Sequence, residues 1–171
     1  MTTSIQLREA STHDLDAINK VIEIAVMGWD LPERVKRLSL PSYHYNEFDL
    51  QHLHMLIAEM NNTIVAVAAW EQAADKDTPQ GQTALLLHGL YVDPQWHRHG
   101  IGCRLFKAIE QASQAQGLDG LLVKAQKEAE PFFLAMGMQR LPVENIARDY
   151  ANRFWKNIII NREPTLNKSA N

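Results

Sequence analysis

Two glycines, one residue apart, open a strongly helical stretch in the segment VDPQWHRHGIGCRLFKAIEQA. The first turn of a helix exposes backbone amides without partners and carries a partial positive charge, which favours a phosphate group. Gly100 and Gly102 have no side chains, so an anion can approach these amides and the turn can take positive φ. Arg98 can add a charge-assisted contact. The pattern predicts an anion site over residues 97–103, but two glycines alone fit a helix-entry turn without a ligand equally well.

Two other phosphate-binding loops do not fit this segment. The nucleotide-triphosphate loop GxxxxGK[ST] is absent, because no lysine follows either glycine. The dinucleotide loop GxGxxG needs a third glycine, which the sequence lacks after Gly102. Cys103 could be acidified at a helix start, although a small helix-packing residue is the favoured interpretation.

His88 is the second residue that could do chemistry, and it lies inside the strand-like run LLLHGLYV. An alkylamine with a pKa of about 10.4 is almost wholly protonated at pH 7, so a reaction at its nitrogen gains from a base. Histidine ordinarily titrates at about pH 6.5, which suits proton transfer near neutrality. A buried or hydrogen-bonded core histidine is the alternative, and the sequence leaves both open.

The remaining histidines are scattered and show no zinc-ligand spacing, so we expect no metal. The net charge of −3 and the pI of about 6.1 give no basic face for nucleic acid. No apolar run approaches the roughly 20 residues that cross a bilayer, and the N-terminus does not resemble a secretory signal. With one cysteine, these features predict a cytoplasmic protein without membrane or nucleic-acid partners, and a homodimer stays open.

Periodicity predicts the order β-αα-βββ-α-β-α-β(β) within one domain over residues 1–162, followed by a polar tail at 163–171. A Ser11–Asp14 capping box starts the first helix, and Asn61-Asn62 makes a hairpin turn. Pro41 is expected to stop the second helix, with a loop over 41–49. The expected strands lie near residues 5–7 and at 54–60, 63–70, 83–92, 121–125 and 150–160, and the expected helices lie at 15–29, 32–38, 101–117 and 128–136.

The glycine segment also resembles a known family. VDPQWHRHGIG is similar to motif A of the GNAT N-acetyltransferase superfamily, (Q/R)xxGx(G/A), with His97 in place of the usual Gln or Arg. Downstream, EAEPFFLAMGM is similar to the second motif, AxxFYxxxGF, with Ala129, Phe132, Phe133 and Gly137 in register. The specific likeness covers residues 85–140, and the element order agrees over residues 4–160.

The resemblance implies an α/β (α+β) fold: a mixed, mostly antiparallel sheet of six or seven strands, flanked by about four helices and splayed at a cofactor cleft. It implies acetyl-CoA as the cosubstrate, with pantetheine along the strand that ends at residue 92 and pyrophosphate on the glycine turn. The positions implied to contact the cofactor are Leu90, Tyr91, Val92, His97, Arg98, His99, Gly100, Ile101, Gly102, Cys103 and Phe133. It also implies a bulge in that strand, where a backbone amide can stabilise an oxyanion.

The activity implied is direct attack of an amine, from a small molecule or a peptide, on the thioester, with His88 as the base. The acceptor is expected near Trp29, Tyr43 and Glu71. The family often has a tyrosine at position 133 to protonate the thiolate, and Phe133 has no proton to give. Tyr91 is a candidate donor, although its side chain is expected to point away from the His88 face. The missing tyrosine supports an alternative, a non-catalytic acyl-CoA-binding regulatory or interaction module.

Overall fold

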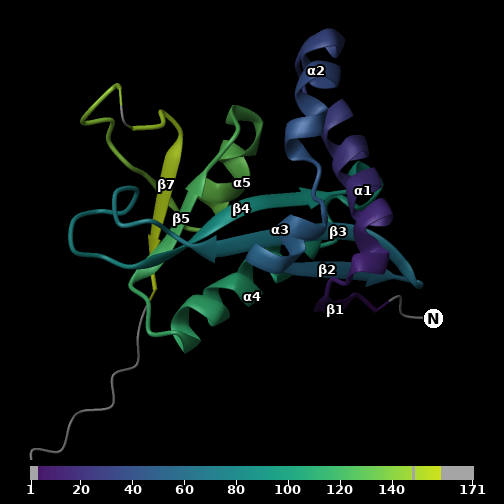
Figure 1. Ribbon diagram of the computed structural model, residues 1–171, viewed down its shortest axis with the longest axis horizontal. Helices are drawn as coiled ribbons and strands as arrows, with labels where there is room; N and C mark the ends of the chain where they lie inside the picture. Colours follow the sequence, from purple (N-terminus) through teal and green to yellow (C-terminus); the bar gives the residue numbers. More distant parts are fainter. Residues whose placement is uncertain (1–3, 148, 159–171) are drawn as a thin grey trace, which may run out of the picture.

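A seven-stranded sheet in the order β1-β2-β3-β4-β5-β7-β6 forms the centre of the molecule (Figure 1). The computed structural model describes residues 4–147 and 149–158. Only β4 and β5 pair in parallel among the described strands, so the sheet is mixed and mostly antiparallel, and the predicted fold class is confirmed. The strands are β1 Gln6–Glu9, β2 His54–Met60, β3 Thr63–Gln72, β4 Ala84–Val92, β5 Gly120–Lys124, β6 Gln139–Arg140 and β7 Arg153–Asn157.

Helices cover both faces of this sheet. Helix α1 packs Ile18, Ile22 and Val26 on one face, whereas α4 and α5 pack on the other (Figure 1). Apolar residues recur every three or four positions along α1 and α4, which gives each helix one buried stripe. The α-helices are α1 Leu15–Met27, α2 Glu33–Tyr43, α3 Glu47–His52, α4 Ile101–Ala115 and α5 Glu130–Ala135, and short 3₁₀ turns span Thr12–Asp14, Pro94–Trp96 and Lys127–Ala129.

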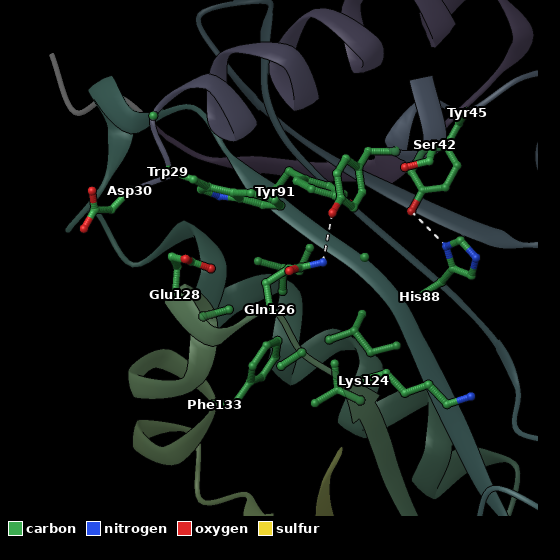
Figure 2. Close-up of a pocket in the computed structure, with 18 of the residues that line it drawn as sticks. Trp29, Asp30, Ser42, Tyr45, His88, Tyr91, Lys124, Gln126, Glu128 and Phe133 are labelled. Carbon is green, nitrogen blue, oxygen red and sulfur yellow. Dashed lines mark hydrogen bonds between the residues drawn. The ribbon is translucent and has the colours of Figure 1, made fainter. Parts of the chain in front are cut away.

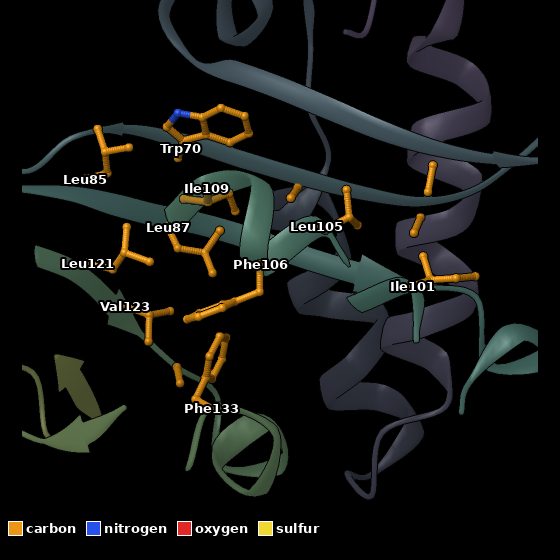
Figure 3. Close-up of a cluster of buried hydrophobic side chains, with 14 of the residues drawn as sticks. Trp70, Leu85, Leu87, Ile101, Leu105, Phe106, Ile109, Leu121, Val123 and Phe133 are labelled. Atoms are coloured by element: carbon orange, nitrogen blue, oxygen red, sulfur yellow. The ribbon is translucent and has the colours of Figure 1, made fainter. Parts of the chain in front are cut away.

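The larger core cluster lies between the sheet and α4 (Figure 3). Leu85 and Leu87 of β4 meet Leu105 and Phe106 of α4 in it, and all four are almost fully buried. Burying a side chain of this size stabilises the fold by about 1.5–3 kcal/mol. This packing holds α4, and hence the glycine turn at its start, at a fixed place against β4.

Strand β4 changes its pairing half way along. Residues Ala84–Leu87 pair with β3 on one side and with β5 on the other. At His88 the register to β3 shifts, because Ala69 faces Gly89 and Trp70 faces Leu87. The recorded β4–β5 pairs end at Leu87, so the second half of β4 separates from β5. The bulge and the splay that the resemblance implied are therefore both present.

Several local predictions are confirmed. Asp14 accepts hydrogen bonds from the Ser11 amide (2.8 Å) and hydroxyl (3.0 Å), which makes the predicted capping box. Asn61 and Asn62 both take positive φ in the β2–β3 turn, as a tight hairpin requires. Gly117 has φ +68° directly after α4, where a left-handed residue commonly ends a helix.

The segment from Pro41 to Asp49 is not the predicted loop. Helix α2 continues through Pro41 to Tyr43, because a fixed φ near −65° is helical and the lost hydrogen bond falls in the last turn. Helix α3 then begins at Asn46, whose side chain accepts from the Asp49 amide at 3.0 Å. This Asn46–Asp49 capping box was readable in the sequence.

The later elements also differ in detail. The helix expected over 128–136 is a 3₁₀ turn followed by α5, because Pro131 stands in the first turn of α5. The two-residue strand β6 is too short to predict from alternation. Of the strand expected over 150–160, β7 occupies Arg153–Asn157.

Helix α2, like the shorter α3, has no fully buried residue, and only Leu40 and Tyr43 pack partly buried against the α1 cluster. Val35 and Leu38 are 48% and 73% exposed. The Lys36 ammonium fastens α2 to the end of α1 by donating to the carbonyls of Met27 (2.8 Å) and Trp29 (3.2 Å). The last residue of this helix, Tyr43, reaches the site described below.

Some expectations stay predictions. The domain boundary at 162, the tail 163–171 and residues 159–160 of the last strand lie outside the described residues. No helix within 4–147 and 149–158 is long and apolar enough to cross a membrane. The cytoplasmic location stays a prediction from the sequence, and the possibility of a homodimer stays open.

Candidate active site

His88 stands at the β4 bulge, and its side chain is exposed and faces a cavity (Figure 2). His88 is therefore hydrogen-bonded, as the alternative allowed, but it is not a buried core histidine. The imidazole is held by one partner, the Tyr45 hydroxyl, which lies 3.3 Å from Nδ1. When Nδ1 carries the proton and donates to this hydroxyl, the Nε2 lone pair is left free to accept a proton.

Tyr45 itself is locked in place. Its backbone amide donates to Asn19 Oδ1 and its carbonyl accepts from Asn19 Nδ2, both at 2.8 Å. Its hydroxyl lies over Gly89, where an added Cβ would come within 2.6 Å of it. Burial raises the pKa of Tyr45 well above its ordinary value, so the phenol keeps its proton at any physiological pH.

A cavity of about 490 Å³, here called the His88 cavity, opens where β4 and β5 separate (Figure 2). Aromatic rings from α2, β4 and the end of α1 form one wall. Tyr43 meets Trp29 edge-on at 5.3 Å and Tyr91 at 6.5 Å between ring centroids. The opposite wall comes from the end of β5 and the segment that follows it, with the lining residues Val123, Lys124, Ala125, Gln126, Glu128, Ala129 and Phe133.

The charged groups of the His88 cavity are divided between its ends. The carboxylates of Asp30 and Glu128 lie at the end near Trp29, whereas Lys124 lies at the end near His88 (Figure 2). Lys124 pairs with Asp77 at 3.2 Å. The end with the two carboxylates favours a cationic group on a bound molecule.

Beyond the bulge, the edge of β4 opposite β3 is open. The Asp93 amide donates to Val65 of β3 at 2.9 Å. Alternate residues of a strand direct their amides to opposite edges, so Gly89 and Tyr91 face β3 while Leu90 and Val92 face the open edge. At the open edge, His97 Nε2 lies within hydrogen-bond distance of the Val92 carbonyl, at 3.2 Å. An extended chain could therefore bond to Leu90 and Val92 as an added strand does.

The glycine turn at the start of α4 has the geometry of an anion site. Arg98 and Gly100 take positive φ values of +63° and +74°, and Gly100 caps the helix in the left-handed conformation. The first intrahelical hydrogen bond runs from the Arg104 amide to the Gly100 carbonyl at 3.0 Å. The amides of residues 101–103 precede it and have no carbonyl partner within the helix. No side chain caps them.

A second cavity of about 610 Å³, here called the glycine-turn cavity, lies in front of these amides. It shares Trp29, Leu90, Tyr91, His97 and Phe133 with the His88 cavity, so the two form one continuous trough. Its further lining includes Val92, Arg98, Gly100, Ile101, Gly102 and Cys103.

Phe133 is 4% exposed and lines both cavities. Its ring packs against Phe106 and Phe132 at centroid distances of 6.4 and 5.2 Å. Phe132 in turn covers Gly102, where a Cβ would stand 3.1 Å from that ring. Gly102 therefore lets the helix approach α5 closely, in addition to leaving its amide accessible.

Most residues singled out from the sequence meet in this trough, but three placements differ. Tyr91 lines the same cavity as His88, so its predicted orientation away from the His88 face is wrong, because the bulge changes the side-chain alternation along β4. His99 turns its Nδ1 to the carbonyls of Trp96 and His97 and is not among the residues lining either cavity. Glu71 lines neither cavity.

Tyr45, Gly89 and Gln126 were not found from the sequence. Gln126 Nε2 donates to the Tyr43 hydroxyl at 2.9 Å, which joins two walls that lie 83 residues apart in the chain. Tyr45 lies in the segment 41–49 that was expected to be a loop, and nothing in its spacing pairs it with His88. The glycine next to His88 was the one available signal, since a glycine inside a strand often marks a bulge or a close approach. Among the described residues no group of three or more His, Cys, Asp or Glu side chains is placed to hold a metal ion.

Comparison with protein families matches residues 32–151 to the acetyltransferase (GNAT) domain. The chain belongs to the GNAT acetyltransferase family. Acetyl transfer from acetyl-CoA is the activity of this family, so the predicted family and cosubstrate agree with the match. A comparison with curated protein sequences gives no significant match.

Solved structures of GNAT proteins share the fold at low identity. PaiA N-acetyltransferase from Thermoplasma acidophilum, in complex with coenzyme A, has a TM-score of 0.73 and 15% identity, over 90% of this chain and 99% of that one. The ribosomal-protein-S18-alanine N-acetyltransferase from Escherichia coli has a TM-score of 0.62 and 16% identity, over 94% and 98%. The aminoglycoside N-acetyltransferase AAC(6')-Iy, in complex with CoA, has a TM-score of 0.61 and 15% identity, over 83% and 92%.

Proposed function

We propose that this GNAT acetyltransferase is an N-acetyltransferase, in which an amine attacks the thioester of acetyl-CoA directly. The observation that carries the proposal is the single trough that runs from His88, along the open edge of β4, to the free amides at the start of α4. Coenzyme A has an extended pantetheine arm with a pyrophosphate at one end and the thioester at the other. Three of the comparison proteins are named as N-acetyltransferases, two of them in complex with coenzyme A.

In this proposal the pantetheine lies along Leu90 and Val92 and packs against Phe133. The pyrophosphate accepts hydrogen bonds from the amides at residues 98–103, with Arg98 and His97 alongside. The thioester carbonyl then lies near the bulge, where His88 and Gly89 line the cavity. A backbone amide at the bulge can then stabilise the oxyanion.

The acceptor amine occupies the His88 cavity between Trp29, Tyr43 and the Asp30–Glu128 end. His88 takes the proton that the amine must lose, directly or through one water, and Tyr45 fixes the ring for it. Apolar and cationic amines both suit an aromatic wall with two carboxylates beside it. The acceptor is therefore either a small-molecule or a peptide amine. The predicted contact of Glu71 with the acceptor amine is not part of this proposal, since Glu71 lines neither cavity.

The test is release of free thiol from acetyl-CoA with a panel of amines: amino acids, polyamines, arylalkylamines, aminoglycosides and N-terminal peptides. We expect at least one class to raise thiol release well above the rate of hydrolysis, with the acetylated amine visible as a mass gain. Calorimetry on the same sample reports acetyl-CoA binding separately.

A non-catalytic acyl-CoA-binding module is the second candidate, favoured by Phe133 in place of a proton donor. It predicts tight acetyl-CoA binding with no thiol release for any amine. His88, held at the bulge and open to the cavity, argues against it. The absence of nucleic-acid partners stays a prediction from the charge.

A further inference from the structure

The proposed reaction leaves coenzyme A as a thiolate, and the residue at position 133 cannot protonate it. Phe133 lines the trough with a ring that carries no hydroxyl. A hydroxyl does reach the same part of the trough from the other wall, on Tyr43 at the end of α2. We propose that Tyr43 is the general acid that protonates the departing thiolate, with Gln126 as its positioning residue. This rests on the proposed function above.

The hydrogen bond between these two residues sets the direction of the Tyr43 proton. Gln126 follows β5, and its Nε2 donates to the Tyr43 oxygen at 2.9 Å (Figure 2). An amide NH₂ group can only donate, so the Tyr43 oxygen is the acceptor in this bond. The phenol O–H is then free to point into the cavity, and the same N–H stabilises negative charge when the phenol gives up its proton.

Tyr43 suits this role better than the other two tyrosines in the cavity. The Tyr45 hydroxyl is engaged with His88 Nδ1, on the side of the amine's proton rather than the leaving group's. The Tyr91 ring packs against Gly89, and its phenol is more deeply buried. Tyr43 is bonded to the segment that follows β5, which leads into the helix carrying Phe133.

Packing holds the Tyr43 ring in place, and its surroundings keep the phenol protonated. The ring is held between Trp29 and Tyr91, at centroid distances of 5.3 and 6.5 Å. Burial raises the pKa of Tyr43, and the charges of Tyr150 and Glu128 act in the same direction, so the phenol is protonated at neutral pH. A hydrogen bond from this phenol to the departing sulfur stabilises the thiolate before the proton moves.

The step balances without a further reactant. The amine nitrogen bonds to the acetyl carbon, the carbon–sulfur bond breaks, and its electron pair goes to sulfur. His88 takes one proton from the nitrogen, and Tyr43 gives one proton to the sulfur. Water in the exposed cavity carries the proton from His88 back to the phenolate, so the products are the amide and coenzyme A thiol.

The experiment compares Tyr43→Phe with Tyr150→Phe, using thiol release for kcat and calorimetry for acetyl-CoA affinity. Tyr150 is 45% exposed and lines neither cavity, so its variant removes a nearby hydroxyl outside the trough. We expect Tyr43→Phe to lower kcat about 100-fold or more, the lower end of the range for general acid catalysis, and to flatten the basic limb of the kcat–pH profile. Affinity for acetyl-CoA changes less than twofold, and Tyr150→Phe matches the wild type.

A double variant separates chemistry from packing. In Tyr43→Phe/Phe133→Tyr a hydroxyl enters the same trough from the opposite wall, and we expect kcat to recover at least tenfold over Tyr43→Phe, with the basic limb restored. Normal kcat in Tyr43→Phe overturns the assignment. So does a loss confined to the KM of the amine, which is the result for a wall residue. If the wild type binds acetyl-CoA yet releases no thiol with any amine, the proposed function itself fails and the acid assignment falls with it.

Discussion

The two halves of β4 belong to one strand but have different roles, the first in the core and the second in the candidate site. Residues Ala84–Leu87 are paired on both edges, and Leu85 and Leu87 are 1% and 3% exposed. Gly89–Val92 pair with β3 alone, His88 is the unpaired residue of the bulge, and all five residues line the trough. One strand thus contributes a stable half to the core and leaves the backbone groups of the other half available.

This difference has one local cause, the bulge at His88. The extra residue shifts the register to β3 and bends the strand, and the separation from β5 begins at the same point. It also shifts the alternation, so that Leu87, Leu90 and Val92 all face the α4 side while Tyr91 faces the α1 side. Substitutions in the first half should therefore change stability, and those in the second half should change turnover or binding.

The largest expected effect falls on the open half. We expect His88→Ala to lower turnover by about 10²–10⁴-fold, the usual range for a positioned base, because the amine then loses its proton without help. Steady-state thiol release measures this effect. In the wild type kcat/KM should fall toward acid pH, because a protonated base cannot take the proton from the amine.

His13→Ala is the matched control, since His13 is exposed in the 3₁₀ turn before α1 and lines neither cavity. Calorimetry should give nearly unchanged acetyl-CoA affinity in both variants. A folded His88→Ala protein with near-normal turnover and an unchanged acidic limb would exclude His88 as the base.

The paired half should behave in the opposite way. We expect Leu85→Ala to lower the free energy of unfolding by about 2–5 kcal/mol, because the side chain is fully buried between β4 and α4 and its removal leaves a cavity. Urea unfolding followed by circular dichroism measures the loss. Turnover per folded molecule should stay within about twofold, and a much larger fall would erase the distinction between the two halves.

The glycine turn gives a smaller and more specific effect. Gly100 and Gly117 stand at the two ends of α4 with φ +74° and +68°, and an added Cβ meets nothing within 4 Å at either place. Alanine should therefore strain both positions alike. Because only Gly100 lines the trough, Gly100→Ala should weaken acetyl-CoA binding about tenfold, or 1.4 kcal/mol, and Gly117→Ala should leave it unchanged. Equal affinities by calorimetry would remove the pyrophosphate assignment.

The smallest expected effect separates acid unfolding from acid inactivation. The hydrogen bond from Arg8 holds the pKa of Asp14 well below its ordinary value of about 3.9. A depressed carboxyl pKa stabilises the fold at pH values above the ordinary one, and the contribution is lost as the pH falls below it.

Asp14→Asn should consequently cost about 1 kcal/mol at pH 7, as loss of a capping group does, and progressively less below pH 4. Thermal unfolding from pH 3 to pH 7 measures the trend. Since the stability from this pair is complete above about pH 5, a fall in kcat/KM that begins above that pH belongs to the site. A constant difference between the two proteins down to pH 3 would contradict this account.

The sequence was most informative where local chemistry decides the structure. The Ser11–Asp14 capping box, the Asn61-Asn62 turn and the glycines around α4 were all predicted because each is specified within a few residues. The glycine turn at residues 97–103 is also specified locally. Only the resemblance of its flanking residues to a family motif distinguished it from a helix entry without a ligand. Pro41 misled the prediction, because a proline φ is itself helical and α2 continues through Pro41 to Tyr43 with the loss of one hydrogen bond.

The parts that depend on distant partners could not be predicted. His88 was identified by type, whereas its partner Tyr45 comes from 43 residues earlier and is placed by Asn19 of α1. The link between Tyr43 and Gln126 crosses 83 residues. Tyr91 was given the wrong orientation because strict alternation was assumed through a strand whose bulge position was not known. Contacts across such separations are set by the packing of α1 and α2 on the sheet.

Helix α2 lies over the site without belonging to the core. It has no fully buried residue and is fastened by Lys36 to two carbonyls at the end of α1, yet it delivers Tyr43 to the trough. Amide hydrogen exchange should therefore be fast in α2 and slow in β4 and α4, since local opening of α2 exposes little apolar surface. The cofactor side of the trough, formed by β4 and α4, then keeps its shape while α2 on the acceptor side opens and closes locally. Sequence changes in α2 can alter which amines enter without disturbing the fold beneath them.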